Sequence, residues 1–215
     1  QLIQTSVFAG TWSLLSPLAR AAGANEDVRV AVIGFNGRGN NHIDDLLKAK
    51  GCRVVALCDC DENVLAKGKE RLAKKGVNVQ TYTDYRKLCE SKEIDAVSIA
   101  TPNHTHVLIA LTAAANGKHV YVEKPVSHNV WEGRQLALGA EKYKVIIQHG
   151  FQRRSETSWA EAFAWLNEGP IGALKLARGF CYKPRPSIGK TDSALRLDSS
   201  IHADLWFGPR EVAPL

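Results

Sequence analysis

The sequence predicts an α/β fold built around a doubly wound parallel sheet. Between Val28 and Gly150, short β-branched or apolar runs alternate with amphipathic segments. This alternation is typical of a parallel sheet that is covered by helices on both faces. The run Asp95–Ala100 is mostly apolar, as in strands buried on both sides. A glycine-rich turn at 34–39 joins the first expected strand to the first expected helix.

The individual elements follow from this alternation in chain order. Strands are expected near 28–33, 52–58, 78–82, 95–100, 118–123 and 144–149. Helices are expected near 40–49, 62–75, 84–91, 104–116 and 129–142. Together they predict a first domain over residues 26–150.

The turn after the first strand contains Gly34, Asn36, Gly37, Arg38 and Gly39. Its glycines let the backbone turn sharply and approach a pyrophosphate, which then lies on N–H groups at the helix N-terminus. Asn36 replaces the second glycine of the usual G-x-G-x-x-G pattern, but asparagine tolerates positive φ better than most residues. A plain strand-to-helix turn is the alternative. In its context, the turn predicts a Rossmann-type nucleotide-binding domain.

Asp59 ends the second expected strand, 20 residues after Gly39. An acidic residue at this distance binds the ribose hydroxyls of adenosine. The alternative role is a helix cap, for which Asp61 is better placed. A carboxylate at position 59 would repel a 2′-phosphate, so NAD is favoured as the cofactor. NADP remains possible, because Arg38 could pair with either phosphate.

The segment Thr101, Pro102, Asn103, His104, Thr105, His106 follows the fourth expected strand. Ligands of doubly wound sheets bind at the carboxyl ends of the strands, so this segment is expected to border the cofactor. Asn103 has the alternative role of a helix cap. One of the two histidines could hydrogen-bond cofactor or substrate, or it could be structural. They are two residues apart and point in different directions on a helix, so no metal site is expected.

Glu123-Lys124-Pro125 follows the fifth expected strand. A lysine at this edge can hold a substrate hydroxyl or stabilise charge on an alkoxide, so Lys124 is the candidate catalytic residue. A solvent-exposed lysine is the alternative. Arg153 follows the sixth strand and could meet a phosphate, a carboxylate or sugar hydroxyls, although plain surface charge explains it equally well.

The composition excludes several other classes of protein. The net charge is +6, but its densest basic group lies along the expected helix 62–75, as on a solvated helix face. No aromatic platform accompanies it, so no nucleic acid partner is expected. The five cysteines include no C-x-x-C pair, which excludes a disulfide framework and a zinc site.

Residues 1–25 resemble a leader rather than part of the fold. The stretch 6–19 is mostly small and apolar, and Ala19–Ala24 resembles signal-peptidase sites. The stretch is too short and too polar to span a membrane. An exported protein that carries a cofactor would suit the twin-arginine route to the periplasm. A plain N-terminal arm of a cytoplasmic protein is the alternative. The chain contains no methionine, which favours a processed chain or a fragment.

The regular alternation of expected strands and helices ends after Gly150. An amphipathic helix is expected over 155–167 and a long strand over 171–182, and Leu205, Trp206 and Phe207 form a later apolar group. Residues 151–215 are too few for a typical domain with its own core. They are expected to be the start of a second, α+β domain that is incomplete here.

Five motifs occur together in order and spacing: Gly34–Gly39, Asp59, Thr101–His106, Ala113–Val120 and Glu123–Pro125. With them the chain resembles the glucose–fructose oxidoreductase / inositol dehydrogenase / rhizopine-catabolism (Gfo/Idh/MocA) family over roughly residues 28–182. The leader and the segment Asp204-Leu-Trp-Phe-Gly-Pro209 resemble exported bacterial members.

The resemblance implies an NAD(P)-dependent oxidoreductase that acts on sugars or cyclitols and forms a homo-oligomer at full length. The residues that it implies at the cofactor are Thr101, Pro102, Asn103, His106, Glu123 and Lys124. Lys124 would also touch the substrate hydroxyl, and Arg153 and Lys183 are candidate substrate contacts.

The chain departs from the family in one respect. The family's proton-transferring Asp and His lie in the second domain, beyond the segment that resembles Asp204–Pro209, and no matching motif is found here. His202 with Asp204 does not fit it. Two other functions stay open within the resemblance. One is glycoside hydrolysis by transient oxidation with tightly held NAD, and the other is non-catalytic nucleotide binding.

Overall fold

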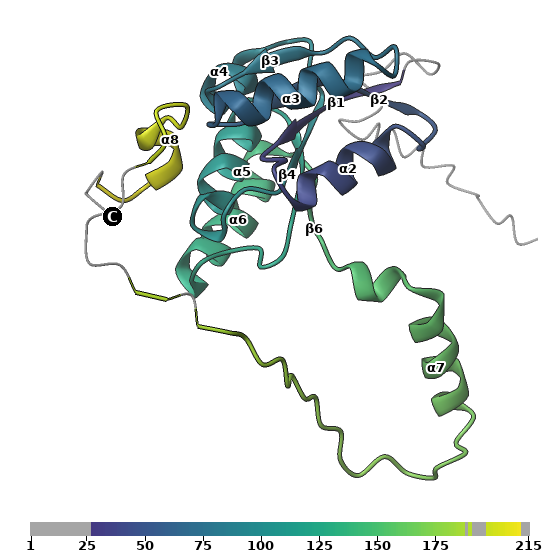
Figure 1. The fold of residues 1–215 in the computed structure, drawn as a ribbon. Coiled ribbons are helices and arrows are strands. Elements are labelled where there is room, and N and C mark those ends of the chain that lie inside the picture. The colour runs from purple at the N-terminus through teal and green to yellow at the C-terminus, as the bar shows by residue number, and fades with distance from the viewer. Residues whose placement is uncertain (1–26, 188, 191–196, 212–215) are drawn as a thin grey trace, which may run out of the picture.

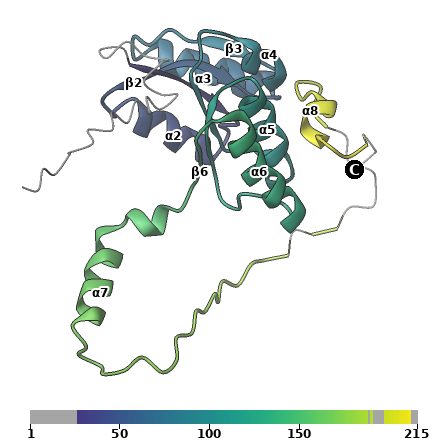
Figure 2. The same cartoon turned by 180° about the vertical axis from the view of Figure 1, so that it is seen from behind.

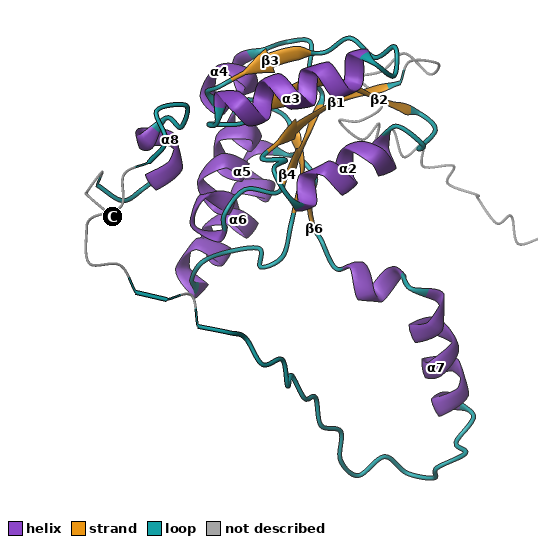
Figure 3. Ribbon diagram, in the orientation of Figure 1, coloured by secondary structure: helices purple, strands orange, loops and turns teal. Residues whose placement is uncertain are grey.

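The computed structural model describes residues 27–187, 189–190 and 197–211. These residues form a six-stranded parallel sheet with the order β3-β2-β1-β4-β5-β6 (Figures 1 and 3). This is the doubly wound order that sequence alternation predicts. The strands are β1 (Val28–Ile33), β2 (Cys52–Cys58), β3 (Gln80–Tyr82), β4 (Ala96–Ile99), β5 (His119–Val122) and β6 (Ile147–His149).

Helices cover both faces of the sheet, with α2 and α3 on one face and α5 and α6 on the other (Figures 1 and 2). The α-helices are α2 (Arg38–Leu46), α3 (Glu62–Ala73), α4 (Tyr85–Glu90), α5 (His106–Ala115), α6 (Val130–Tyr143), α7 (Thr157–Asn167) and α8 (Ala203–Phe207). Two 3-10 helices, η1 (Asn103–Thr105) and η2 (Gln152–Ser155), follow the ends of β4 and β6.

The core has one apolar cluster on each face of the sheet. Alternation along β1 separates them, because Ala31 and Ile33 pack with α4, α5 and α6, whereas Val32 packs with α2 and α3. Phe35, just after β1, belongs to the second cluster and is 2% exposed. Burial of the strands on both faces explains their nearly continuous apolar sequences. The turns at the carboxyl ends of the strands are therefore held on a rigid support.

The expected strands and helices of residues 28–150 are confirmed, with shifts at their ends. α2 begins at Arg38, two residues before its expected start, and the helix expected at 104–116 begins as η1. α7 confirms the helix expected at 155–167. The predicted leader lies outside the described residues, so its role in export stays a prediction.

The strand expected over 171–182 is wrong, because these residues adopt no regular structure. A strand satisfies its N–H and C=O groups only by pairing with a neighbour. The described residues offer this segment no such neighbour, and it runs away from the sheet (Figures 1 and 2). A largely apolar composition that ends in Phe180 and Tyr182 was therefore not sufficient to form a strand.

Residues 200–202 lie against residues 60–62, next to the end of β2. α8 lies beside α4 and α5 in both views (Figures 1 and 2). Across the described ranges, no helix is long and apolar enough to cross a membrane. The same ranges contain no cluster of His, Cys, Asp and Glu that is able to hold a metal ion.

Candidate functional site

A groove runs along the carboxyl ends of the strands. It consists of a first hollow of about 350 Å³ and a second hollow of about 420 Å³, which share Arg38, Ala100 and Thr101. β1 and β4 are neighbours in the sheet although β2 and β3 lie between them in sequence. The groove therefore crosses the switch point of the sheet, where ligands of open α/β sheets bind.

The glycines of the first turn have two different roles. A Cβ on Gly34 would lie 2.8 Å from the Thr101 nitrogen, and the φ of Gly34 is +77°, which favours glycine. A Cβ on Gly39 would lie only 2.0 Å from the Gly34 carbonyl oxygen, so this glycine lets α2 pack against β1. An added Cβ on Gly37 would meet nothing within 4 Å, and this residue lines the first hollow. Gly37 is thus the glycine that leaves open space for a ligand.

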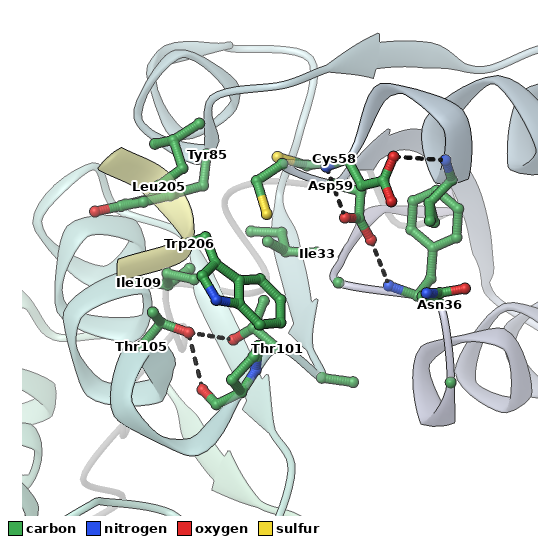
Figure 4. Close-up of a pocket in the computed structure, with 18 of the residues that line it drawn as sticks. Ile33, Asn36, Cys58, Asp59, Tyr85, Thr101, Thr105, Ile109, Leu205 and Trp206 are labelled. Atoms are coloured by element: carbon green, nitrogen blue, oxygen red, sulfur yellow. Dashed lines mark hydrogen bonds between the residues drawn. The ribbon is translucent and has the colours of Figure 1, made fainter. Parts of the chain in front are cut away.

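Asp59 lies at the wall of the first hollow, where its position is fixed by backbone donors (Figure 4). The Phe35 N–H donates to Oδ2 and the Asp61 N–H to Oδ1, each at 3.1 Å. Burial raises the pKa of Asp59 above its ordinary value, although these N–H groups oppose the rise. Each oxygen keeps a further lone pair, so the carboxylate is oriented and still able to accept hydrogen bonds from a ligand.

The opposite wall of the first hollow follows β4. Thr105 Oγ1 lies 2.9 Å from the Pro102 carbonyl oxygen, to which it donates, and 2.9 Å from Thr101 Oγ1, whose hydroxyl is then the donor (Figure 4). Two residues of α8, Leu205 and Trp206, complete the lining. Most of the other lining side chains are apolar, so this hollow suits a flat, uncharged group.

Glu123 is the centre of the second hollow. It is 4% exposed, and its Oε1 accepts hydrogen bonds from Arg38 Nε at 2.9 Å, from His42 Nε2 at 3.1 Å and from Gln152 Nε2. Its Oε2 accepts the Lys124 N–H at 3.0 Å. One carboxylate therefore joins the ends of β1, β5 and β6.

The ionisation of Glu123 follows from these contacts. Burial disfavours the charged form, but the donors from Arg38, Gln152, His42 and Lys124 outweigh it and lower the pKa from 4.5 to about 2. Glu123 is therefore a carboxylate at neutral pH. Since hydrogen bonds to a charged group are among the stronger ones in proteins, Glu123 holds Arg38 and the Lys124 backbone in place.

Two members of this network, His42 and Ser98, were not expected from the sequence. His42 Nδ1 lies 2.8 Å from Ser98 Oγ, and a neutral ring that donates to Glu123 accepts the serine hydroxyl there. The order Ser–His–Glu resembles a nucleophilic triad, but Ser98 is 5% exposed within β4 and lines neither hollow of the groove. The network is therefore structural. Its sequence signals were a serine in an apolar strand and a histidine on the buried face of a helix.

The structure brings most of the other expected residues to the second hollow. Asn103 lines it, Lys124 is exposed at its edge, and Arg153 lines it while pairing with Glu156 at 2.9 Å. The Lys124–Pro125 peptide bond is cis. Polar groups from three strand ends therefore converge here.

Two expected residues lie differently. His106 also lines the second hollow, but it is 1% exposed, with Nδ1 2.7 Å from the Pro125 oxygen and Nε2 2.8 Å from the Thr101 oxygen. It therefore ties the turn after β4 to the turn after β5. Lys183 lies in the exposed segment after α7 and lines neither hollow, so its contact with substrate stays a prediction.

The groove fits the chemistry of a dinucleotide. Such a molecule carries a base and a ribose at each end of a pyrophosphate, and the groove has a hollow on each side of Arg38. Gly37 leaves open space next to Arg38, where the pyrophosphate is expected. Asp59 lies in one hollow and Lys124 lies in the other, and the sequence predicts the adenosine ribose at the first and the substrate at the second.

Comparison with known protein families agrees with this geometry. Residues 28–151 match the model of the Gfo/Idh/MocA family, which is described as an oxidoreductase family with an NAD-binding Rossmann fold. The match covers more than half of the chain and includes Asp59 and Lys124.

Individual relatives give a similar result. The chain is 30% identical to a scyllo-inositol 2-dehydrogenase (NAD(+)) of Bacillus subtilis over 180 residues, 81% of this chain and 51% of that protein. It is 42% identical to a glycosyl hydrolase family 109 protein of Streptomyces niveus over 105 residues, 46% of this chain and 21% of that protein. The crystal structure of a myo-inositol 2-dehydrogenase from Lactobacillus plantarum is 31% identical, with a TM-score of 0.63 over 68% of this chain and 43% of that one. The chain spans about half the length of the curated inositol dehydrogenases that it matches.

Proposed function

Since this chain belongs to the Gfo/Idh/MocA oxidoreductase family, whose Rossmann domain binds NAD, we propose that its groove serves hydride transfer between NAD and a sugar or cyclitol. One observation carries the proposal: a single groove has an oriented carboxylate, Asp59, in one hollow and the Glu123–Lys124 pair in the other. The inositol dehydrogenases among its relatives support a polyol as the substrate class.

Different residues along the groove would bind different parts of the cofactor and the substrate. When bound, NAD supplies the carbon that accepts or returns the hydride. Asp59 would accept hydrogen bonds from the adenosine ribose, and the open backbone at Gly37 would admit the pyrophosphate. Lys124 would hold the substrate oxygen and stabilise the negative charge that develops on it as the hydroxyl loses its proton, before its carbon gives up the hydride. Glu123 accepts hydrogen bonds from Arg38 and from the Lys124 backbone, so it would hold both residues in position.

Turnover tests the proposed activity. The protein isolated from its source, mixed with NAD and either myo-inositol or scyllo-inositol, is expected to form NADH, measured by absorbance. The polyol loses a hydride and a proton and becomes a ketone. If NAD binds but none of a panel of cyclitols and sugars yields NADH, the proposed oxidoreductase activity is wrong, and non-catalytic nucleotide binding is the better account.

A second function is NAD-dependent glycoside hydrolysis, and one observation favours it. The 42% identity to a glycosyl hydrolase family 109 protein falls on 105 residues of this chain. Cofactor that stays bound through purification, together with release of nitrophenol from nitrophenyl glycosides and no net NADH, would identify this activity. NADH formation with a free polyol would favour the dehydrogenase instead.

Asp59→Ala tests the cofactor preference. Loss of the carboxylate removes the acceptor for the ribose hydroxyls and the charge that repels a 2′-phosphate. The affinity for NADH is therefore expected to fall about tenfold, the effect of losing roughly 1.4 kcal/mol, while the affinity for NADPH stays the same or improves. Titration calorimetry with both nucleotides measures the change.

The matched control is Glu70→Gln, which removes an exposed charge on α3 that lines neither hollow. Its affinities for NADH and NADPH are expected to equal those of the parent protein. Thermal unfolding of both variants checks that the fold survives. Unchanged NADH affinity with no gain for NADPH in a folded Asp59→Ala protein would show that Asp59 does not select the cofactor.

We also propose that residues 151–215 begin the second domain that the sequence predicts. α7 supports this, because Trp159, Phe163 and Trp165 on this helix are between 46% and 56% exposed. Large apolar side chains gathered on one exposed helix are typical of a surface that packs against another part of a protein.

A further inference from the structure

We propose that residues 198–210 form a clasp over the first hollow and that Trp206 is the aromatic contact for the adenine base of NAD. The inference rests on the proposed function, since it assigns one end of the same cofactor to a segment outside the Rossmann domain. It adds a residue that the motif pattern of the domain does not contain, because Trp206 lies well beyond residues 28–151.

Backbone hydrogen bonds hold the start of the clasp against the residues that follow Asp59. The Glu62 N–H donates to the Ser200 oxygen at 3.0 Å, and the His202 N–H donates to the Cys60 oxygen at 2.9 Å. Between them, Asp61 and Ile201 form an antiparallel bridge. The clasp is thus paired with the turn after β2, which also supplies Asp59.

Contacts with the turn after β4 hold the other end of the clasp. His104 Nε2 lies 2.8 Å from the Trp206 carbonyl oxygen, and since a carbonyl only accepts, the histidine donates. Phe207 is 6% exposed, so it anchors α8. Arg86 pairs with Asp204 at 3.2 Å, but both side chains are largely exposed, and such a pair contributes little. The clasp therefore bridges the two turns that form opposite walls of the first hollow.

The two aromatic residues at the end of α8 have different surroundings. Phe207 is buried, whereas Trp206 is 37% exposed and lines the first hollow with Leu205. Figure 4 shows the Trp206 ring in the hollow with Thr101 and Asp59. Sites that bind nucleic acid bases use aromatic side chains in this way, because every base presents a flat π-face. Adenine is flat and uncharged, and it matches this wall and the apolar lining.

The position of Asp59 indicates that the base in the first hollow is adenine. A ribose bound at Asp59 directs its base into the hollow that Trp206 lines, while the pyrophosphate runs toward Arg38 and the second hollow. A volume of about 350 Å³ lies within the usual range of small-molecule sites, about 300–1,000 Å³. The clasp would therefore favour nucleotides that carry a purine base.

Binding of cofactor fragments tests the clasp. Trp206→Ala is expected to lower the affinity for NADH and for ADP-ribose about tenfold. Nicotinamide mononucleotide, which lacks adenine, is expected to bind the parent protein and the variant equally well. Trp206→Phe keeps an aromatic face and is expected to retain most of the affinity. The matched control is Trp165→Ala, on the exposed face of α7, which is expected to change none of these affinities.

A spectroscopic readout covers the case in which Trp206→Ala fails to fold. AMP is expected to quench tryptophan fluorescence of the parent protein, and Trp206→Phe is expected to lose that quenching although the other four tryptophans remain. Full affinity of Trp206→Ala for NADH, or quenching that persists in Trp206→Phe, would overturn the role of Trp206. Absence of NADH binding in the parent protein would instead contradict the proposed function.

Discussion

Glu123→Gln is expected to lower the free energy of unfolding by about 3 kcal/mol, because it removes the charge on which three side chains and one backbone N–H converge. Glu123 is nearly fully buried, so the donors that it satisfies cannot all turn to water. The amide of glutamine places an N–H group where the carboxylate accepts. Chemical denaturation at neutral pH measures the loss.

The same substitution is expected to change how stability depends on pH. The pKa of Glu123 is about 2 in the folded protein and 4.5 ordinarily, so its contribution is fully present above about pH 4.5. It is lost as the pH falls toward about 2. The difference in stability between the parent protein and Glu123→Gln should therefore shrink over that window. The difference between the two pKa values corresponds to a contribution of roughly 3 kcal/mol from Glu123 to the free energy of unfolding at neutral pH.

Glu141→Gln is the matched control, since this exposed carboxylate lies on α6, outside the groove. Its stability is expected to stay within about 0.5 kcal/mol of the parent at every pH. A Glu123→Gln protein as stable as Glu141→Gln at neutral pH would contradict the assignment of Glu123 as the charge that holds this end of the groove together.

Gly39→Ala is expected to cost several kcal/mol of stability and to abolish binding of NADH. A Cβ at position 39 would lie 2.0 Å from the Gly34 oxygen and 2.9 Å from Phe35 Cβ. One of these contacts is backbone, so α2 would have to move away from β1. Overpacking of this kind costs about 1–3 kcal/mol and occasionally more. The movement would also displace Arg38 and Gly37 from the groove.

Gly37→Ala separates binding from stability. An added Cβ at this position meets no atom within 4 Å, so stability should change far less than in Gly39→Ala. Its methyl group would enter the space expected for the pyrophosphate, so NADH affinity should still fall. Gly179→Ala, in an exposed segment with the same open space, is expected to change neither property. Equal stability losses at positions 37 and 39 would contradict the two roles assigned to these glycines.

The part of the fold that follows from local pattern was predictable from the sequence. Burial of strands on both faces produces the apolar runs that define β1 and β4, and the glycine at position 34 marks the turn between β1 and α2. The positions of Asp59 and Lys124 beside the groove were predictable, because the carboxyl ends of parallel strands all lie at the same edge of the sheet.

Contacts between distant segments were not predictable in this way. His42 meets Glu123 only because α2 crosses the sheet over β4, and no local pattern records that crossing. The group Leu205–Phe207 stood out as apolar, but its place at the groove depends on bonds to Cys60 and His104, far away in sequence. The strand expected over 171–182 failed for a related reason, since pairing requires a neighbour and composition alone does not supply one.

Direct titration of the purified chain with NADH, followed by competition with NADPH, tests the central claim. We expect one NADH bound per chain, with an affinity at least about tenfold higher than that for NADPH, because in the proposed site Asp59 would accept hydrogen bonds from the ribose hydroxyls and would repel a 2′-phosphate. Absence of NADH binding, or an NADPH affinity equal to or above that for NADH, would contradict it.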